Sequence, residues 1–554
     1  MDENLDEGTI REMETVLGTK IYPGTEIMKD VGAHHFVKGQ HRSVLVPQPS
    51  DDPQDPLNWS PFWKGATIFA ATAVSFSLNL GPLALAPMFE NYVELYNRPL
   101  VDIVQFTGIA ILVLGFSNFI WVPMSTCFGR RPVAILSTAI CAFSSVWRAR
   151  ATGYDSFMAA SVLNGLGAGP CETLMPQVIA DIIFLHDRGK YQTLYFSMYF
   201  MSLMVGPVIS GAMALHTGVE SFWWFNTGML FFTVIVCIFL FPETRYDRRV
   251  KAPQPTGAVA QPYGKEPVSP YRSSGEKATS AGYEDALATV PSAPIAPMAT
   301  HVDPALGKGG PGKKQFMPFQ PYAGSLLREL WLPWYLHLYP IVEFAAFVVS
   351  FSASGFLVVN LSQAQVFAAP PYNFTSETIG LFNLAVLVGG FIGLITCGPL
   401  SDWVASRLTA RNNGVREPEM RLMAMIPYIF IMIIGSVVTA VGYDNHWPWQ
   451  VIVIVGYTCL GIQVAALPSI ASTYAIDSYK PVTGSIFVTI TINKNLWGYG
   501  VGKFLTPWSI ASGFEQPMLI NMALITIFSC SGIIFWFWGK KFRGITANSF
   551  VHTL

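Results

Sequence analysis

The stretch FWWFNTGMLFFTVIVCIFLFPETRYDRRVK, residues 222–251, joins an apolar run to a basic segment. Its first part, near residues 222–242, has about 20 mostly apolar residues, the length that a helix needs to cross a bilayer. Arg245, Arg248 and Arg249 follow directly. Clustered positive charge of this kind is typical of the cytosolic end of a membrane span. The stretch therefore predicts a membrane helix that ends in the cytosol.

Further apolar runs of this length recur along the 554-residue chain. Hydrophobic residues make up 51% of the sequence and charged residues 12%, about half the charged share that is usual in a soluble domain. This composition predicts an all-α membrane protein. The other runs lie near residues 62–89, 103–125, 132–151, 156–185, 191–215, 331–361, 376–400, 421–442, 447–475, 482–510 and 517–539.

A long polar segment, residues 243–328, separates the runs into two groups of six. It is rich in Pro, Gly, Ser and Ala and has no periodic apolar face, so we expect it to be largely disordered. A flexible joint is expected where two halves move against each other. The sequence thus predicts twelve transmembrane helices in two six-helix bundles. The predicted parts are a cytosolic tail (1–60), a first bundle (61–242), a cytosolic linker (243–328), a second bundle (329–540) and a cytosolic tail (541–554).

Lys and Arg residues in the loops indicate which side of the membrane each loop faces. With both termini in the cytosol, the loops after spans 2, 4 and 8, the linker and the C-terminal tail carry their basic residues inside. The predicted outer loops are poor in positive charge, apart from Arg98, Arg148 and Arg150. The acidic N-terminus lacks the apolar segment of a signal peptide. Asn373, in an Asn-Phe-Thr triplet of the outer loop after span 7, is a candidate glycosylation site.

The sequence has no pattern of a catalytic or metal site. Its seven cysteines are scattered singly, and its nine histidines form no cluster in the spans. No phosphate-binding Gly-x-x-x-x-Gly-Lys-Ser/Thr loop occurs, which disfavours an ATP-driven pump. A net charge of −1 gives no reason to expect a nucleic acid partner. We therefore expect no catalytic residue, no metal ion and no cofactor.

Short motifs recur at defined places between and within the spans. The loop after span 2 reads VPMSTCFGRR (122–131), and the loop after span 8 begins GPLSD (398–402). Span 5 contains GPVISG (206–211), whose small residues let helices approach closely while the proline bends the span. The candidate residues of these motifs are Gly129, Arg130, Arg131, Gly398 and Asp402 in the loops, and Gly206, Pro207, Ser210 and Gly211 in span 5.

Three more short motifs lie next to the ends of spans: DPQDPLNW (52–59) before span 1, HDRG (186–189) after span 4 and FPET (241–244) after span 6. With these motifs the chain resembles the major facilitator superfamily over about residues 50–540, and within it the fungal twelve-span drug:proton antiporter branch. The family associates the span 5 motif with export. Thr126 replaces the acid of the family's first-half loop pattern. The resemblance implies the major facilitator fold, and we expect a monomer.

Three ionisable residues are predicted near the centres of spans: Glu172 in span 4, Glu343 in span 7 and Lys494 in span 11. A charge at the bilayer centre costs at least about 2.5 kcal/mol, so such a group is usually kept inside the bundle, paired or used. In relatives span 4 often carries a basic residue that is proposed to couple protons, and Ser161 stands in its place here. We therefore predict that Glu172 and Glu343 are proton-coupling groups.

Lys494 with its neighbour Asn493, and Asn164 in span 4, complete the predicted polar part of this site. Trp497 and Tyr499 follow in the glycine-rich stretch WGYGVG of span 11. Aromatic rings there could hold an organic cation by cation–π attraction. Packing against lipid or other helices remains the alternative for the rings. A structural Glu–Lys pair, or a charge that lies nearer an interface, remains the alternative for the charged residues.

These features predict a proton-coupled secondary transporter in which two bundles rock about a central site. We expect it to export a drug-like or toxic small molecule. Proton-driven uptake of a polyamine or other organic cation remains open, and a membrane receptor or enzyme is the least favoured reading. The expected partners are a small-molecule substrate, protons and the lipid bilayer. The expected location is the plasma membrane, with the vacuolar membrane as the alternative.

Overall fold

The computed structural model describes residues 20, 22, 24–27, 50, 52–246, 307–322, 324–412, 414–547 and 549–552, without the side chains of 185–190 and 480. Most of the predicted linker, residues 247–306, and most of the predicted N-terminal tail lie outside the described residues. The described part is almost entirely helical.

Six spans form the first half of the molecule. Span 1 continues from α2 through η2 into α3, and span 4 is made of α6 and α7, which meet at Gly169. The bounds are η1 (Pro56–Asn58), α2 (Pro61–Leu83), η2 (Ala86–Met88), α3 (Phe89–Tyr96), α4 (Leu100–Phe128), α5 (Arg130–Arg150), α6 (Tyr154–Ala168), α7 (Pro170–Ile182), α8 (Leu185–His216) and α9 (Val219–Leu240).

Six further spans form the second half, preceded by the short helix α10. A π-helical segment, η6, opens the tenth span. The bounds are η4 (Lys313–Phe316), α10 (Leu326–Leu336), α11 (Pro340–Phe367), α12 (Ser376–Arg411), η5 (Pro418–Met425), α13 (Ile426–Asp444), η6 (Val451–Tyr457), α14 (Thr458–Ser478), η7 (Lys480–Val482), α15 (Thr483–Ser512), α16 (Glu515–Cys530), α17 (Gly532–Thr546) and η8 (Phe550–His552).

The predicted twelve spans in two six-helix bundles are confirmed. Ten helical segments of the described chain are long and apolar enough to cross a membrane by themselves. The other two spans, α6–α7 and α15, are the ones that carry Glu172 and Lys494. One is divided into two short helices, and the other carries the polar run Asn493–Asn495 in the middle of its length.

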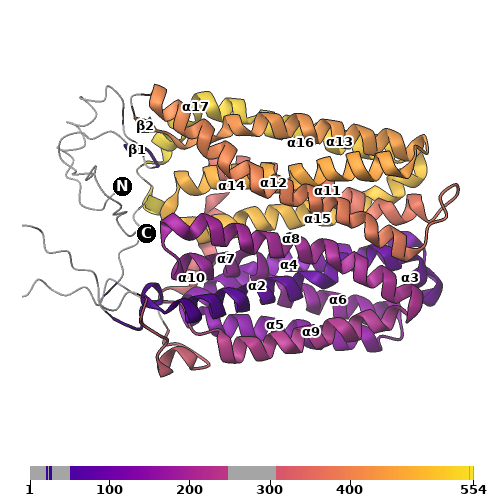
Figure 1. The fold of residues 1–554 in the computed structure, drawn as a ribbon, viewed down its shortest axis with the longest axis horizontal. Helices are drawn as coiled ribbons and strands as arrows, with labels where there is room; N and C mark the ends of the chain where they lie inside the picture. Colours follow the sequence, from indigo (N-terminus) through magenta and orange to yellow (C-terminus); the bar gives the residue numbers. More distant parts are fainter. Residues whose placement is uncertain are drawn as a thin grey trace, which may run out of the picture.

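The two halves lie side by side with their spans nearly parallel (Figure 1). Contacts between the halves run along α4 with α15 and along α8 with α12. We call the end of the bundle that carries residues 241–246 and 307–322 the linker end, and the opposite end, with α3 and the loop 368–375, the far end. In Figure 1 the linker end is on the left.

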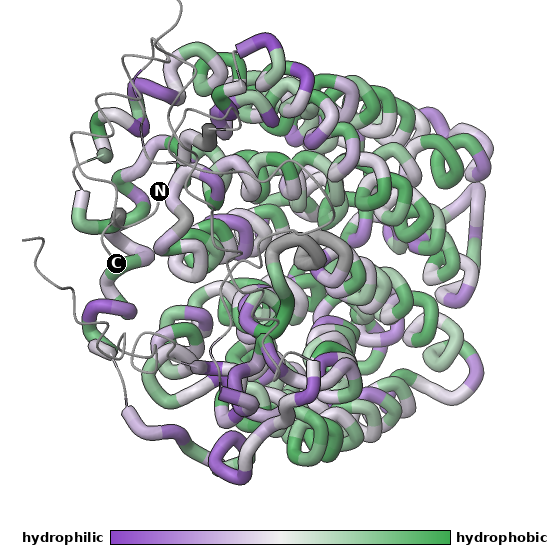
Figure 2. The backbone as a smooth tube through the Cα atoms, turned by 60° about the vertical axis from the view of Figure 1, so that its left-hand side comes forward, coloured by the Kyte–Doolittle hydropathy of each residue, from purple (hydrophilic) through white to green (hydrophobic). Residues whose placement is uncertain are grey.

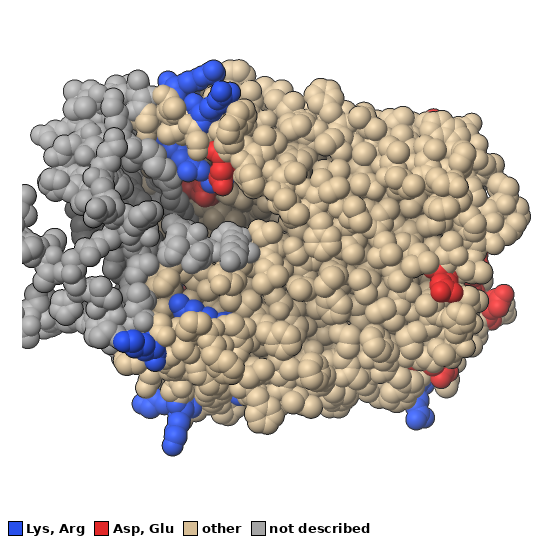
Figure 3. Space-filling view, in the orientation of Figure 1, with Lys and Arg blue, Asp and Glu red and all other residues tan. Residues whose placement is uncertain are grey.

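Hydropathy and charge follow this architecture. The helices are mostly hydrophobic along their length, and hydrophilic residues gather towards their ends (Figure 2). On the face shown in Figure 3, Lys and Arg gather mainly at the linker end, and the middle of the bundle carries almost no charged side chain. This distribution is that of a chain with an apolar belt around its middle, as a bilayer requires.

The last part of the predicted linker is ordered. Residues 307–322 pack against the start and the end of the first half, where the Ser60 N–H donates to Gly309 O at 2.8 Å and the Glu243 N–H to Gln315 O at 2.8 Å. Trp63 packs edge-on against Phe316. Backbone hydrogen bonds and aromatic contacts, among them that of Tyr322 with Phe128, hold a segment whose composition alone gave no sign of order.

A short N-terminal segment contacts the second half. Its strand β1 (Glu26–Ile27) pairs antiparallel with β2 (Val415–Arg416), which follows α12. The preceding Thr25 hydroxyl donates to Glu417 Oε2 at 2.8 Å. At the linker end the chain therefore touches the second half before it enters the first.

Candidate functional site

Glu172 lies at a break in the fourth span. Gly169 keeps helical backbone angles (φ −48°, ψ −47°) directly before Pro170, which opens α7. A residue before proline is normally pushed out of the helical region by its Cβ, and glycine has none. A Cβ on Gly169 would also lie only 2.1 Å from Ser117 Oγ of α4. Glu172 is thus in the first turn of a helix that begins inside the bundle.

The Glu172 carboxylate accepts hydrogen bonds from two other spans. Lys494 Nζ of α15 donates to Oε1 at 2.5 Å, and the Tyr199 hydroxyl of α8 donates to the same oxygen at 2.7 Å. Asn495 Nδ2 lies 3.3 Å from Oε2. The side chain of Glu172 is 8% exposed and that of Lys494 is 19% exposed. The central charges therefore form an ion pair that joins α7 of the first half to α15 of the second.

This pair is costly to break from one side only. Two charges removed from water are tolerated when they neutralise each other and their remaining hydrogen-bonding groups are satisfied. Tyr199 and Asn495 donate these further hydrogen bonds to the Glu172 carboxylate. Neither belongs to the predicted site residues, and the only signal for Asn495 was its place beside Lys494. The pair was one of the alternatives left open by the sequence.

The backbone around Glu172 is fixed within the first half. Cys171 O accepts from the Tyr195 hydroxyl, which in turn accepts from Ser75 Oγ at 3.1 Å. Thr173 Oγ1 donates to Asn118 Oδ1 at 2.6 Å. The first turn of α7, which carries the carboxylate, is therefore held within the first half, whereas Lys494 reaches the carboxylate from the second half.

The two predicted asparagines lie apart from this carboxylate. Asn164 of α6 donates through Nδ2 to Ser144 Oγ of α5 at 3.1 Å, inside the first half. Asn493 donates to Thr489 O, one turn earlier in its own helix, at 3.3 Å. The structure thus places Asn495, rather than Asn493, against Glu172.

The predicted aromatic pair points in two directions. Trp497 packs edge-on against Phe351 of α11, with ring centroids 4.8 Å apart, and its indole nitrogen is buried without a hydrogen-bond partner among the described residues. Tyr499 lies against Gly108 of α4, and the Lys503 ammonium lies 5.7 Å from its ring centroid. Trp497 therefore faces the second half and Tyr499 the first, so the two rings do not form one wall.

Glu343 lies at the linker end and not near the middle of span 7. The predicted run 331–361 is two helices, because the chain turns between Leu336 and Pro340 and α11 starts only there. Tyr339, before the proline, has the extended backbone (φ −96°, ψ 110°) that a side chain favours at that position. Glu343 falls in the first turn of α11, where it contacts His337 Nδ1. The expected central position of Glu343 is corrected accordingly.

The span 5 motif forms a tight contact between the halves near the far end. A Cβ on Gly211 would lie 2.4 Å from Ser376 O of α12, and a Cβ on Gly380 of α12 would lie 2.6 Å from Pro207 O. Gly206 faces Leu80 of α2 as closely, at 2.5 Å from the carbonyl oxygen. Ser210 Oγ donates to Pro207 O within the helix at 3.1 Å. The backbones of α8 and α12 therefore meet directly, which closes the far end along this contact.

The first-half loop motif lacks the family's acid, and acidic residues from other parts of the chain contact it instead. Glu243, after span 6, accepts from the backbone N–H of Arg130 at 3.0 Å and of Arg131 at 3.1 Å. Asp181, at the end of α7, lies 2.6 Å from Arg130 Nε. Gly129 has φ +106°, and a Cβ there would lie 2.4 Å from Glu243 Oε2. The loop after span 2 is thus locked by two acids that its own pattern does not contain.

The second half has a larger network at the same end. Asp402 binds Arg421 Nη1 at 2.8 Å, and Arg421 Nε lies 2.9 Å from Asp477. Nothing lies within 4 Å of a Cβ on Gly398. The fully buried Arg543 of α17 binds Glu417 at 2.5 Å and Glu419 at 2.8 Å.

Burial alone would raise the pKa of the Glu417 carboxyl, but Arg543, with Lys540 and Thr25, holds that pKa below its ordinary value. Sequence reasoning did not select this cluster, because its members lie far apart along the chain.

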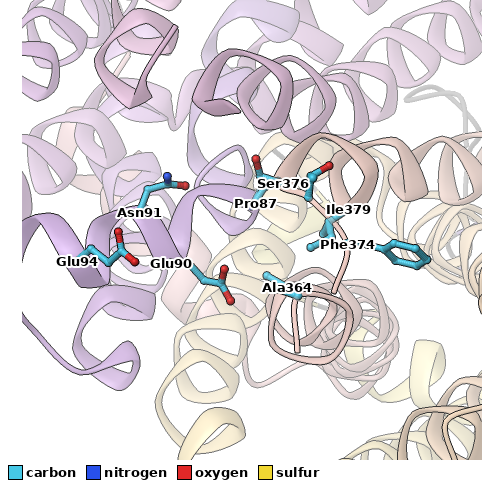
Figure 4. A pocket seen from close by; sticks show the side chains of 10 residues that line it. Pro87, Glu90, Asn91, Glu94, Ala364, Phe374, Ser376 and Ile379 are labelled. Atoms are coloured by element: carbon cyan, nitrogen blue, oxygen red, sulfur yellow. The ribbon is translucent and has the colours of Figure 1, made fainter. Parts of the chain in front are cut away.

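Two further features lie at the far end. Asn373 is exposed in the loop between α11 and α12, with φ +51°. A cavity of about 180 Å³ opens nearby between the halves (Figure 4), and its lining residues do not include Glu172 or Lys494. It is lined by Pro87, Glu90, Asn91 and Glu94 of the first half and by Ala364, Ala368, Phe374, Thr375, Ser376 and Ile379 of the second.

Comparison with known families and proteins gives one consistent result. The model of the Major Facilitator Superfamily matches residues 66–498. An uncharacterised MFS-type transporter of Schizosaccharomyces pombe is 23% identical, over 93% of this chain and 91% of the relative. Protein HOL1 of Saccharomyces cerevisiae is 23% identical over 90% of each chain. The probable efflux pump mfs2 of Aspergillus flavus is 22% identical, over 84% of this chain and all of the relative.

Among solved structures, a D-xylose-proton symporter has a similar fold. The TM-score is 0.56 at 11% sequence identity, over 84% of this chain and 97% of the symporter. At that identity the likeness concerns the fold alone.

Proposed function

The chain belongs to the Major Facilitator Superfamily of membrane transporters, and we propose that it couples export of a drug-like or toxic small molecule to protons. The observation that carries the proposal is the Glu172–Lys494 ion pair, which bridges the two halves near the middle of their spans. Alternating access requires the halves to move against each other. A carboxylate that binds the halves together only while it is ionised makes that movement depend on protonation.

The proposed coupling step takes place at Glu172. Its ionised carboxylate holds Lys494, and a proton on it removes the negative charge and with it the attraction between α7 and α15. The backbone contact of α8 with α12 keeps the far end closed, so the halves then separate at the linker end. The proton reaches Glu172 from the outer side while the halves are open at the far end; the protonated transporter then closes there and opens at the linker end, where it releases the proton to the cytosol and binds substrate. Glu343 has no part in this step, because it lies at the linker end beside His337.

The proposed direction of transport and the proposed membrane location rest on separate observations. A relative that matches 84% of this chain is named a probable efflux pump, which supports transport out of the cytosol. The Lys and Arg residues at the linker end support a cytosolic position for that end and for both termini (Figure 3). We propose a monomer in the plasma membrane, with the vacuolar membrane as the alternative and Asn373 glycosylated on the outer side.

Inside-out vesicles with an imposed pH gradient test the proposal. Their acidic lumen corresponds to the outside of the cell, so an exporter accumulates its substrate in the lumen. The probes are a panel of fluorescent drug-like dyes and radiolabelled spermidine. We expect accumulation of at least one dye that collapses with the gradient. Glu172→Gln should abolish the gradient dependence when accumulation is normalised to the amount of protein in the vesicles, and Glu343→Gln should retain it.

Two results would contradict the proposal. Gradient-dependent accumulation that persists in Glu172→Gln would remove the coupling role of this carboxylate. Spermidine that is taken up only by right-side-out vesicles with an acidic exterior would establish the alternative, proton-driven uptake of an organic cation.

A further inference from the structure

The short helix α10 has an exposed apolar face within the part of the chain that the structure describes. With 11 residues it is about 16 Å long, too short to cross a bilayer. Leu332, Pro333 and Leu336 are buried on one side of the helix, and large apolar side chains three, four and seven positions apart lie on the other, so they share one face. Trp331 on this face is 67% exposed. The exposed face consists of Leu327, Leu330, Trp331 and Trp334, with Leu338 just after the helix.

This helix packs on the side of α15 that faces away from Glu172. The Thr489 hydroxyl of α15 donates to Pro333 O of α10 at 3.0 Å. Leu496 lies about two turns further along the same face of α15 as Thr489, and its side chain is exposed. Lys494, which binds Glu172, points about 160° around the helix from Leu496. α10 therefore covers part of the outer surface of the bundle, in line with a residue that faces the surroundings of the spans.

α10 also touches the first half. The Trp334 ring stacks on that of Phe119 of α4, with centroids 4.6 Å apart and planes 6° from parallel. Phe116 and Ile120, beside Phe119 on α4, are exposed. Phe119 itself belongs to a small buried apolar cluster that joins the halves. α10 thus lies across the seam between α4 and α15. The cluster consists of Phe119, Val122, Val488 and Ile492.

The contact with Phe119 places the end of α10 at the level of the bilayer. α4 has 29 residues and is about 43 Å long, whereas the hydrocarbon core of a bilayer is about 30 Å thick. When α4 is centred in that core, about 6 Å of the helix lies outside it at each end. Phe119 is about 13 Å from the linker end of α4 at Phe128. The C-terminal part of α10 is therefore level with the acyl chains rather than with the cytosol.

We propose that α10 is an interfacial membrane helix whose exposed face is covered by the lipid acyl chains of the leaflet at the linker end. Large exposed apolar patches mark membrane or protein contacts, and Trp is enriched where a bilayer meets water. The face continues the apolar belt of the neighbouring spans, through Phe116, Ile120 and Leu496. Arg328, on the flank of the helix, pairs with Glu329 at 3.2 Å, at the level of the headgroups. Lipid thus completes the cover over the seam, whatever the substrate and the direction of transport.

Nitroxide labels on the full-length protein in phosphatidylcholine nanodiscs test the proposal. Leu327→Cys and Trp331→Cys carry the label in a background where Cys459 and Cys530 are replaced by Ser, because the other cysteines are buried. Oxygen concentrates among acyl chains, whereas a water-soluble nickel chelate is excluded from them, so collisions of the label with each reagent report its surroundings. Ile527→Cys, at an exposed position of the last span, is the lipid reference, and Lys308→Cys is the aqueous reference.

We expect the ratio of oxygen to nickel collisions at Leu327→Cys and Trp331→Cys to be several-fold above that at Lys308→Cys and close to that at Ile527→Cys. Arg328→Cys is the matched control, because it lies on the flank of the same helix, and its ratio should be lower than that of both neighbours. A ratio on the exposed face equal to that at Lys308→Cys would overturn the proposal. Low collision rates with both reagents would overturn it as well, because protein rather than lipid would then cover the face.

Discussion

Glu172 and Glu343 lie in the first turns of helices that begin with proline, yet these helices begin at different depths. Pro170 follows a glycine that stays helical, so α7 continues α6 and its first turn lies inside the bundle. Pro340 follows a tyrosine with an extended backbone, so α11 starts afresh at the linker end. The residue before the proline therefore decides whether the acid becomes part of the contact between the halves or part of a helix end.

The partners of the two acids differ accordingly. Glu172 meets Lys494 of the other half and is 8% exposed, whereas Glu343 meets His337, six residues earlier, and is 22% exposed. A long-range pair inside the bundle constrains how two halves are placed. A local pair at a helix end does not. Substitutions at these positions should therefore have very different consequences.

Lys494→Ala should have the largest effect on stability. Removing the cation leaves an uncompensated carboxylate inside the bundle, which we expect to cost about 3–5 kcal/mol of unfolding free energy. Lys503→Ala is the matched control on the same helix, because Lys503 is exposed. Thermal unfolding in detergent measures both. Equal unfolding temperatures for the two variants would mean that the pair contributes nothing to the contact between the halves.

Gly169→Ala should have an intermediate effect. The added Cβ would lie 2.1 Å from Ser117 Oγ and would make helical backbone unfavourable before Pro170. We expect a loss of about 1–3 kcal/mol from this overpacking. Gly153→Ala serves as the control, since nothing lies within 4 Å of a Cβ there. If both variants unfold at the same temperature, the glycine is not what lets α7 start inside the bundle.

Glu343→Gln should have the smallest effect. Its pair with His337 is local and partly exposed, and such pairs contribute about 0–1 kcal/mol. We expect the unfolding temperature to change little, and the change to be the same in a His337→Gln background. A loss as large as that of Lys494→Ala would show that Glu343 holds more of the structure together than its contacts indicate.

The sequence predicted the spans and the halves because long apolar runs and basic loops are direct consequences of the bilayer. It could not divide span 7 correctly, since residues 331–339 are mostly Trp, Tyr and Leu and run without a strongly polar break into the helix that follows. The sequence also placed Arg148 in an outer loop, whereas the structure buries its side chain in the last turn of α5.

Contacts between segments that lie far apart along the chain could not be predicted from the sequence. The lock of the loop after span 2 comes from Glu243 and Asp181, each acting on a motif far away along the chain. Lys494 was selected for its depth, but nothing in its own neighbourhood indicated that Glu172 was its partner. Pairing of this kind depends on the packing of the two halves, which one sequence does not reveal.

Pulsed electron resonance between nitroxide labels on the two halves would measure whether protonation of Glu172 opens the pair. Phe62→Cys and Trp403→Cys place exposed labels towards the linker ends of α2 and α12, in a background where the exposed Cys530 is replaced by Ser. We predict that the distance between the labels lengthens when the pH falls, and that Glu172→Gln shows the long distance at every pH. A distance that is independent of pH, or one that shifts equally in Glu172→Gln, would contradict the proposed switch.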